Sequence, residues 1–339
     1  MESLRELPLI DVMALVTPGA SAEDKRACAA QIDKACRESG FFRIKGHGVP
    51  EALQRKLDKL SRQFFDLPTE EKEKISMKKA GAAWKGWFPV FGELTSGKPD
   101  GKEGLYCAKE LGDEHPRVKA KVPLHGRNQF PESPAELGPT ILEWIDKMSD
   151  LGKALLRGVA LGLGMPENWF AENICQEPTE QFRVFHYPPP DLSHLKPGEH
   201  PGWGVGEHTD YGLITILAQD DCGGLQVRSG ESWIHVPAED NVFIINIGDM
   251  LDKLTEGRYR STPHRVLNAS GRQRLSFPFF VDPSWDAEVV PLPLEGCPPA
   301  DNVSERWDAK SVHAWTGPYG IYFTGKVSKC FPELFASIQ

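Results

Sequence analysis

Three residues in the second half of the chain have the types and the spacing of a metal site. His208 and Asp210 are two positions apart, and residues at i and i+2 of a strand point to the same face. His264 begins a later strand candidate, with 53 residues between it and Asp210. Two histidines and one carboxylate suit iron(II) and leave coordination positions free, whereas zinc hydrolases more often use three histidines or cysteine-containing sets. The spacing therefore predicts an iron(II) site at these three residues.

A second pair of polar residues follows on the next strand candidate. Arg274 and Ser276 lie shortly after His264 and share one face of a strand. An arginine that points into a barrel is unfavourable unless an anion pairs with it. From the residues alone, two partners stay open for Arg274: an internal Asp or Glu, or the carboxylate of a bound ligand. A His-x-Asp pair alone is a weak indication of a metal site, and the arginine downstream strengthens that indication.

The elements that must position these residues change in kind along the chain. The first part predicts helices, one beginning at Ser21 with Asp24 as a capping acid and one ending near Gly164, with strands at 7–12 and 41–45. From residue 181 onward, short β-type runs separated by turn residues are typical of sandwiches and barrels. These runs are 182–187, 213–218, 224–227, 233–236, 242–247, 264–267 and 274–281.

The predicted fold class is α+β, with a helical N-terminal half packed on a jelly-roll or cupin-like barrel. The expected N-terminal region is 5–135, and its segment 80–135 is rich in Gly, Pro, Trp and Phe, as expected of a lid over a site. The expected barrel region is 136–339, with a catalytic core at about 180–285. The two regions are expected to enclose one site.

Composition excludes several classes of protein. The chain has 339 residues and a net charge of −9, which argues against a nucleic-acid surface. No apolar run is long enough to span a membrane, and no secretory signal is evident. The seven cysteines include no C-x-x-C pair, so they predict reduced thiols and a cytoplasmic protein. The expected partner is a small-molecule substrate, with no nucleic acid, membrane or protein partner evident.

Several ordered motifs resemble one family, the 2-oxoglutarate/Fe(II)-dependent dioxygenases, in the isopenicillin-N-synthase-like branch. The resemblance covers about residues 5–335. The motifs are Ser39-Gly40-Phe41-Phe42, Gly46-His47-Gly48-Val49, the run His208 to Leu217, Asn246-Ile247-Gly248-Asp249, Ser261 to Val266 and Arg274-Leu275-Ser276.

The resemblance implies a double-stranded β-helix and assigns roles within it. His208, Asp210 and His264 would hold Fe(II), while Arg274 and Ser276 would bind the distal carboxylate of 2-oxoglutarate. Tyr187 matches a tyrosine that also reaches this cosubstrate. Many plant members have asparagine where this chain has Phe185, which cannot form the hydrogen bond.

The resemblance also implies an oxygenase reaction. Oxidative decarboxylation of 2-oxoglutarate would be coupled to hydroxylation of a small organic molecule, or to desaturation, ring closure or demethylation. The cofactors would be Fe(II), 2-oxoglutarate and O₂, with ascorbate as a supporting reductant. Two alternatives stay open: a related Fe(II) oxidase that uses O₂ without 2-oxoglutarate, and a non-catalytic ligand-binding protein on the same fold.

Residues of the lid segment and of the strand before Tyr187 are the candidates for substrate contact. Arg183 shares a strand face with Tyr187 and is expected either to pair with Glu103 or to bind an acidic group of the substrate. For each lid residue, packing within the lid is the alternative to substrate contact. The candidates are Arg183, Glu103, Lys85, Trp87, Phe91 and Tyr106.

Overall fold

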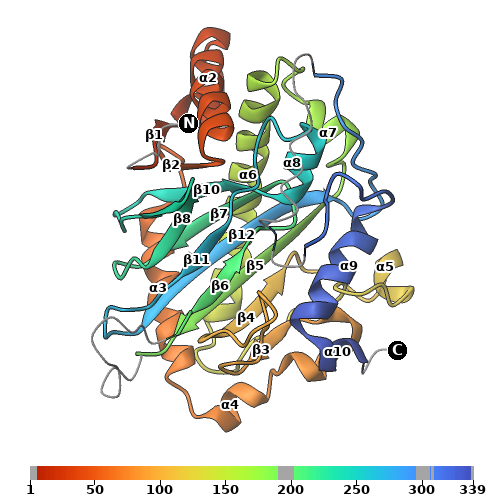
Figure 1. The fold of residues 1–339 in the computed structure, drawn as a ribbon. Coiled ribbons are helices and arrows are strands. Elements are labelled where there is room, and N and C mark those ends of the chain that lie inside the picture. The colour runs from red at the N-terminus through yellow and green to blue at the C-terminus, as the bar shows by residue number, and fades with distance from the viewer. Residues whose placement is uncertain (1–5, 190–201, 295–305, 307–308, 337–339) are drawn as a thin grey trace.

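Two β-sheets face each other, and helices pack on the larger of the two (Figure 1). The structure is a computed structural model that describes residues 6–189, 202–294, 306 and 309–336. Residue 5 and residues 337–339, at the outer limits of the two expected regions, lie outside the described residues.

The major sheet has eight strands in the order β1-β2-β10-β7-β12-β5-β4-β3. Its central strands pair antiparallel, and the N-terminal part of the chain supplies two strands at each edge. The strands are β1 (Leu9–Asp11), β2 (Phe41–Lys45), β3 (Gly86–Phe88), β4 (Glu103–Ala108), β5 (Pro178–Tyr187), β7 (Ile214–Gln219), β10 (Phe243–Ile247) and β12 (Arg274–Ser284).

The minor sheet has four strands in the order β6-β11-β8-β9, all paired antiparallel. His264 of β11 is directly opposite His208 of β6, so this sheet brings the two predicted histidine ligands together. The strands are β6 (Val205–His208), β8 (Leu225–Ser229), β9 (Ser232–His235) and β11 (His264–Val266).

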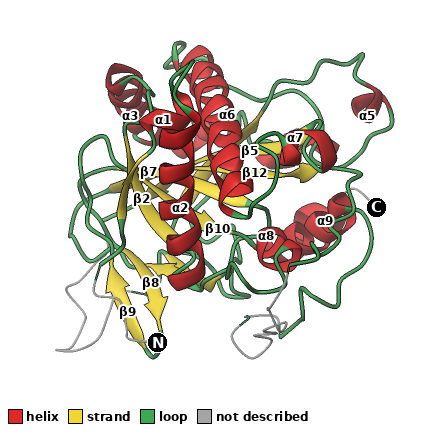
Figure 2. Ribbon diagram, turned by 90° about the horizontal axis from the view of Figure 1, so that it is seen from above, coloured by secondary structure: helices red, strands yellow, loops and turns green. Residues whose placement is uncertain are grey.

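Helices from the N-terminal part cover the outer face of the major sheet. Figure 2 shows α1, α2, α3 and α6 grouped together, with α8 and α9 set apart from them. The helices are α1 (Met13–Val16), α2 (Ala22–Glu38), α3 (Glu51–Phe65), α4 (Thr69–Glu73), α5 (Pro116–Lys119), α6 (Leu137–Gly162), α7 (Trp169–Asn173), α8 (Asp249–Leu254), α9 (Tyr319–Cys330) and α10 (Pro332–Ala336). Two short 3₁₀ turns occupy Met77–Lys79 and Gly81–Ala83.

Helix α6 joins the helical layer to the sheet. It contacts α2 and α3 on one side and β7 and β12 on the other. Gly152 permits this close approach, because a Cβ there would lie 2.7 Å from Val281 of β12. Trp144 of α6 is fully buried, and its ring lies 5.9 Å from that of Phe243 in β10 and 6.4 Å from that of Phe182 in β5.

The C-terminal helices α9 and α10 lie beside β3 and β4 (Figure 1). The backbone N–H of Leu94 donates to the carbonyl of Cys330 at 3.1 Å, and the Phe88 and Phe331 rings pack edge to face. The C-terminal end of the chain therefore packs against the segment that was expected to form a lid.

Most element predictions are confirmed. Ser21 accepts a hydrogen bond from the backbone N–H of Asp24 and caps α2, and each of the seven strand candidates after residue 181 overlaps a strand. The strands β6 and β3 were missed because both are short, and β6 ends at His208, the first residue of its motif. The expected helical half also contributes more strand than predicted, since β3 and β4 form one edge of the major sheet.

Among the described helices, none combines the length and the apolar character needed to cross a membrane.

The architecture of two facing sheets with helices outside is that of the expected double-stranded β-helix.

Replacing Trp144 with alanine tests the packing of α6 on the sheet. The Trp144→Ala variant should lose about 3–5 kcal/mol of unfolding free energy, because the removed indole leaves a cavity among aromatic rings. Equilibrium urea denaturation measures this change. Glu143→Ala is the control, because Glu143 is exposed on the same helix and should change stability by less than about 0.5 kcal/mol. Equal urea midpoints for the two variants would contradict this role of Trp144.

Candidate active site

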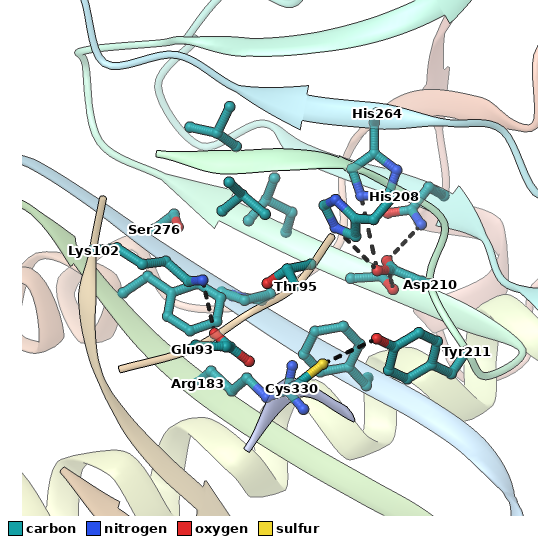
Figure 3. A pocket seen from close by; sticks show the side chains of 18 of the residues that line it. Glu93, Thr95, Lys102, Arg183, His208, Asp210, Tyr211, His264, Ser276 and Cys330 are labelled. Atoms are coloured by element: carbon teal, nitrogen blue, oxygen red, sulfur yellow. Dashed lines mark hydrogen bonds and ion pairs between the residues drawn. The ribbon is translucent and has the colours of Figure 1, made fainter. Parts of the chain in front are cut away.

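The two predicted histidines and the aspartate converge on one point between the sheets. His208 ends β6, His264 begins β11, and Asp210 follows β6 by two residues. The Nε2 atoms of His208 and His264 lie 3.7 and 3.8 Å from Oδ1 of Asp210. Figure 3 shows the three side chains pointing toward one another. Asp210 lies outside the strand, so this convergence comes from the turn after β6 and not from the i, i+2 alternation that predicted it.

Hydrogen bonds to the other atoms of these side chains fix which atoms face the centre. Nδ1 of His208 contacts the carbonyl of Gly206 at 2.8 Å, and Nδ1 of His264 contacts the carbonyl of Thr262 at 3.2 Å. A carbonyl only accepts, so in both rings Nδ1 carries the proton and the Nε2 lone pair is free. This arrangement is how protein ligands to metals are commonly oriented.

The Asp210 carboxylate is oriented in the same way. Its Oδ2 accepts hydrogen bonds from the Thr215 hydroxyl at 2.5 Å and from the Asn246 amide at 2.7 Å, which leaves Oδ1 toward the histidines. Burial raises the pKa of Asp210, but the positive charge of the histidines in their protonated form, at acidic pH, and these two hydrogen bonds outweigh burial and lower the pKa below its usual value. The carboxylate is therefore ionised at neutral pH.

Burial keeps both histidines neutral. It lowers the pKa of His208, and it lowers the pKa of His264 to about 4, with His208 adding to the effect. Neutral imidazoles and an ionised carboxylate are the protonation states that a metal requires. One ligand atom from each of the three residues lies within 4.8 Å of the others, so the nitrogen and oxygen donor set fits Fe(II).

A second group of metal-ligating types, Asp220, Asp221 and Cys222, also clusters in the described part of the chain. Its carboxylates are already paired, because Asp220 binds Arg62 at 2.9 Å and Asp221 binds Arg272 at 3.2 Å. This cluster lies outside the cavity described below.

Arg274 is buried in the same space without a carboxylate partner. Only 1% of its surface is exposed. Its Nε donates to the carbonyl of Gly223 and one terminal nitrogen donates to Oε1 of Gln219, while the other terminal nitrogen, Nη1, has no partner among the described residues. No described Asp or Glu lies within ion-pair distance. The internal Asp or Glu partner that sequence left open for Arg274 is therefore absent from the described part of the chain.

Ser276 and Tyr187 lie beside this arginine. Arg274 is directly opposite Tyr187 in the β5–β12 pair, and its guanidinium lies 4.6 Å from the centre of the tyrosine ring. The Ser276 hydroxyl donates to the Tyr187 hydroxyl at 3.5 Å. A buried guanidinium with a free N–H and two hydroxyls beside it fits one end of a dicarboxylate.

One cavity connects this group to the histidines. It encloses about 950 Å³, including open solvent at its mouth. Alternate residues of β12, from Arg274 to Asp282, line one wall, together with residues of β5 and β7. Strands β6, β8 and β11 of the minor sheet line the opposite wall, and α9 closes a further side.

Of the six predicted substrate residues, the cavity lining contains Arg183 alone. Glu103 is turned away, because its carboxylate accepts from Lys72 at 2.9 Å, from the Trp87 indole at 2.8 Å and contacts His186 at 2.8 Å. The expected Arg183–Glu103 pair is therefore not formed.

Of the other lid candidates, Lys85 and Tyr106 are held by contacts behind the lining, and Phe91 faces solvent. Lys85 donates to the backbone carbonyls of Gly126 and Lys109, and burial lowers its pKa to about 8. Phe91 is 64% exposed. Tyr106 donates to Glu93 and stacks on Arg183, so it supports the lining from behind.

The lid segment lines the cavity with three residues that sequence reasoning missed. They are Glu93, Thr95 and Lys102. Lys102 lies 2.7 Å from Glu93 and 2.6 Å from Asp100, and it is 1% exposed. For Glu93 and Lys102 the sequence offered one signal, which is their charge within a segment rich in Gly, Pro and aromatic residues. Phe185, which was set aside because it cannot hydrogen-bond, also lines the cavity.

Comparisons with known proteins agree with this geometry. The profile of the 2OG-Fe(II) oxygenase superfamily matches residues 178–283. A second profile, the N-terminal region of non-haem dioxygenases in morphine synthesis, matches residues 7–133. Together the two cover more than half of the chain.

Similar proteins extend over nearly the whole chain. A probable iron/ascorbate oxidoreductase of Dictyostelium discoideum is 43% identical, over 98% of this chain and 96% of that protein. A 1-aminocyclopropane-1-carboxylate oxidase of the same organism is 36% identical, over 97% and 96%. A homoarginine-6-hydroxylase of Glycine max is 35% identical, over 97% and 98%.

Solved structures show the same fold. A full-length Neurospora crassa protein in complex with alpha-KG superposes with a TM-score of 0.76 at 24% identity, covering 95% of this chain and 96% of that one. JOX2 in complex with 2OG, Fe and JA has a TM-score of 0.69 at 27% identity, covering 94% and 84%. These findings confirm the predicted fold, reaction class and cofactors: Fe(II), 2-oxoglutarate and O₂, with ascorbate in support. The chain belongs to the 2-oxoglutarate/Fe(II)-dependent oxygenase superfamily, in its isopenicillin-N-synthase-like branch.

Proposed function

We propose that His208, Asp210 and His264 hold the Fe(II) of this enzyme, and that Arg274, Ser276 and Tyr187 bind the distal carboxylate of 2-oxoglutarate. The observation that carries the proposal is the buried Arg274, which has an unpartnered N–H and no described carboxylate beside it. A buried cation without a counter-ion is costly, and a bound dicarboxylate would remove that cost.

Each residue has a defined part in the reaction. Bound Fe(II) and 2-oxoglutarate supply the oxidising chemistry, in which O₂ is consumed, 2-oxoglutarate yields succinate and CO₂, and a C–H bond of the substrate is oxidised. Thr215 and Asn246 hold Asp210 so that Oδ1 faces the metal position. Arg274 and Ser276 hold the cosubstrate by its far end and thereby orient its oxo-acid end toward the histidines. The walls of the cavity limit the access of water to the reacting atoms.

The substrate is a small organic molecule. Two of the relatives are named for homoarginine and 1-aminocyclopropane-1-carboxylate, and one structural neighbour is a complex with JA. The proposed outcome is hydroxylation or a related C–H oxidation: desaturation, ring closure or demethylation.

Nucleic acid, membrane and protein partners have no part in the proposal. A cytoplasmic location is proposed because the described cysteines are all unpaired thiols, as in a reducing compartment.

A second candidate keeps the metal site and drops the cosubstrate. The relatives named 1-aminocyclopropane-1-carboxylate oxidase favour testing an Fe(II) oxidase that uses O₂ without 2-oxoglutarate. Calorimetric titration of the anaerobic Fe(II) protein with 2-oxoglutarate distinguishes the 2-oxoglutarate-dependent oxygenase from this oxidase. Saturable one-to-one binding supports the proposal, and absence of heat at millimolar cosubstrate supports the oxidase.

Removing one imidazole tests the metal site. The His208→Ala variant should bind Fe(II) more weakly by at least about tenfold, because one of three protein ligands is lost. Metal content after anaerobic reconstitution and desalting measures this loss. His235→Ala is the matched control, because His235 is exposed on β9 and should leave the metal content unchanged. Full Fe(II) occupancy in His208→Ala would refute the assignment.

Removing the buried guanidinium tests the cosubstrate site. In Arg274→Gln the KM for 2-oxoglutarate should rise at least about thirtyfold, since losing one partner of a buried charge pair costs about 2–5 kcal/mol. Succinate formation as a function of 2-oxoglutarate concentration measures the change. The control is Arg272→Gln, because the Arg272 side chain is 59% exposed and pairs with Asp221, outside the cavity. An unchanged KM in Arg274→Gln would leave the cosubstrate without its proposed anchor.

A further inference from the structure

Arg183 of β5 is a second cation in the cavity without a carboxylate partner. Its side chain is partly buried, and one terminal nitrogen donates weakly to Oε1 of Gln181 at 3.3 Å. Its Nε is buried and has no hydrogen-bond partner among the described residues. No described carboxylate lies within ion-pair distance of this guanidinium, although Glu93 is close enough to influence its pKa.

Two aromatic rings hold the guanidinium of Arg183 in place. Its central carbon lies 4.2 Å from the centre of the Tyr106 ring and 4.6 Å from that of Phe280. A guanidinium stacked on rings keeps only the donors at its edge available. The N–H groups at such an edge match the two oxygens of a carboxylate. The geometry therefore favours a planar anion over a neutral group.

Two acidic residues of the cavity, Glu93 and Asp282, are near Arg183, but neither forms an ion pair with it, and Asp282 accepts a hydrogen bond from the Tyr319 hydroxyl at 2.6 Å. Lys102 already takes the carboxylates of Glu93 and Asp100, and Glu93 also accepts a hydrogen bond from Tyr106. Arg274 is the other cavity cation without a carboxylate. Once the oxo-acid end of 2-oxoglutarate is bound at the metal, the cosubstrate has a single carboxylate left, so it can satisfy Arg274 or Arg183 but not both.

The strand register separates the two arginines. Arg274 is opposite Tyr187, and Arg183 lies four residues earlier on β5, which places it about 13 Å further along the strand. Figure 3 draws Arg183 beside Glu93 and Cys330, on the side of the cavity away from His208 and His264. The two cations thus mark two ends of one cavity.

Apolar side chains line the same cavity as Arg183, and Phe280 is in contact with its guanidinium. Phe280 belongs to β12, and Phe323, Val327 and Phe331 come from α9 and the residue after it. A ligand held at Arg183 would therefore place its hydrocarbon part against these side chains. Burial of that part adds a favourable contribution of about 25 cal/mol per Å².

We propose that Arg183 binds the carboxylate of the organic substrate, which is therefore a small organic acid with an apolar body. This inference rests on the proposed function, since it assigns Arg274 to 2-oxoglutarate and leaves Arg183 for the substrate. Arg183 orients the acid, so that a carbon distant from the carboxylate faces the metal position.

Matched acids and amides test the charge requirement without any substitution. The anaerobic Fe(II) enzyme, saturated with 2-oxoglutarate, is titrated calorimetrically with hexanoate, 3-phenylpropanoate, indole-3-acetate and L-phenylalanine, and with the primary amide of each. At least one acid should bind about tenfold or more tightly than its amide, because the amide cannot form the charge-assisted pair. The inference is overturned if every amide binds as well as its acid, or if no acid of the set binds.

Arginine substitutions then locate the effect. In Arg183→Gln the acid that binds best should lose about tenfold or more in affinity, and its amide should change less than about twofold. Arg183→Lys should recover part of the loss, because it keeps the charge without the planar edge. Arg127→Gln is the matched control, because Arg127 is 61% exposed and pairs with Asp113 on the surface. Equal weakening of acid and amide in Arg183→Gln would show a packing role and overturn the inference.

Binding of 2-oxoglutarate separates this inference from the proposed function. The Arg183→Gln variant should bind 2-oxoglutarate within about twofold of the unsubstituted enzyme, because Arg274 is intact. If the unsubstituted enzyme fails to bind 2-oxoglutarate, the proposed function fails. If it binds 2-oxoglutarate and the acid–amide difference does not depend on Arg183, the inference alone fails.

Discussion

The orientation of the Asp210 carboxylate is the constraint on which the rest of the site depends. Oδ2 receives hydrogen bonds from Thr215 of β7 and Asn246 of β10, both in the major sheet. The histidines that face Oδ1 belong to the minor sheet. The major sheet therefore fixes the Asp210 carboxylate, and the two histidines that face it come from the minor sheet. A change in the spacing of the two sheets would separate the three ligand atoms, so packing outside the sheets, such as that of α6, contributes indirectly to metal binding.

Local charges, and not the net charge of −9, decide which ligands enter the cavity. Three cations line it, and they differ in what already surrounds them. Lys102 is neutralised by two carboxylates, whereas the hydrogen bonds of Arg274 and Arg183 within the described part of the chain go to neutral oxygens, and both guanidinium groups stack on aromatic rings. The protein has therefore buried positive charge that its described residues do not compensate. An anion bound beside either arginine would lower the cost of that burial, and this is the physical basis on which we propose both as ligand anchors.

Sequence alone predicted the parts of the site that depend on short separations and known residue sets. The convergence of the three candidate metal ligands and of the Arg274–Ser276 pair on one cavity falls in this class, as do the cap of α2 and the strands after residue 181. The reasoning for Asp210 was nevertheless incomplete, because the turn after β6 and not strand alternation aims its side chain. Family resemblance, and not spacing, identified Tyr187.

The lid candidates show why the remainder could not be predicted. Whether Glu103 faces the cavity depends on Lys72, 31 positions earlier, and on His186, 83 positions later. Neither partner is evident from the residues near Glu103. Lys85 was likewise a candidate for substrate contact, but its ammonium group donates hydrogen bonds to two backbone carbonyls instead. Glu93 and Lys102 were missed although they line the cavity, because a buried ion pair in a loop-rich segment has no periodic pattern that would reveal it.

The same contacts determine how much of the expected lid can move. Strand β4 pairs with β5 over Glu103–Ala108, and β3 pairs with β4, so this part of the segment is continuous with the major sheet. Moving it away from the cavity would break that ladder and expose the buried Lys72–Glu103 pair. Arg183 lies on β5, directly opposite Tyr106 of β4. The residue that selects the substrate in our proposal is therefore held by the same rigid sheet that carries Arg274, and the distance between the two anchors is fixed by strand register and not by closure of a loop.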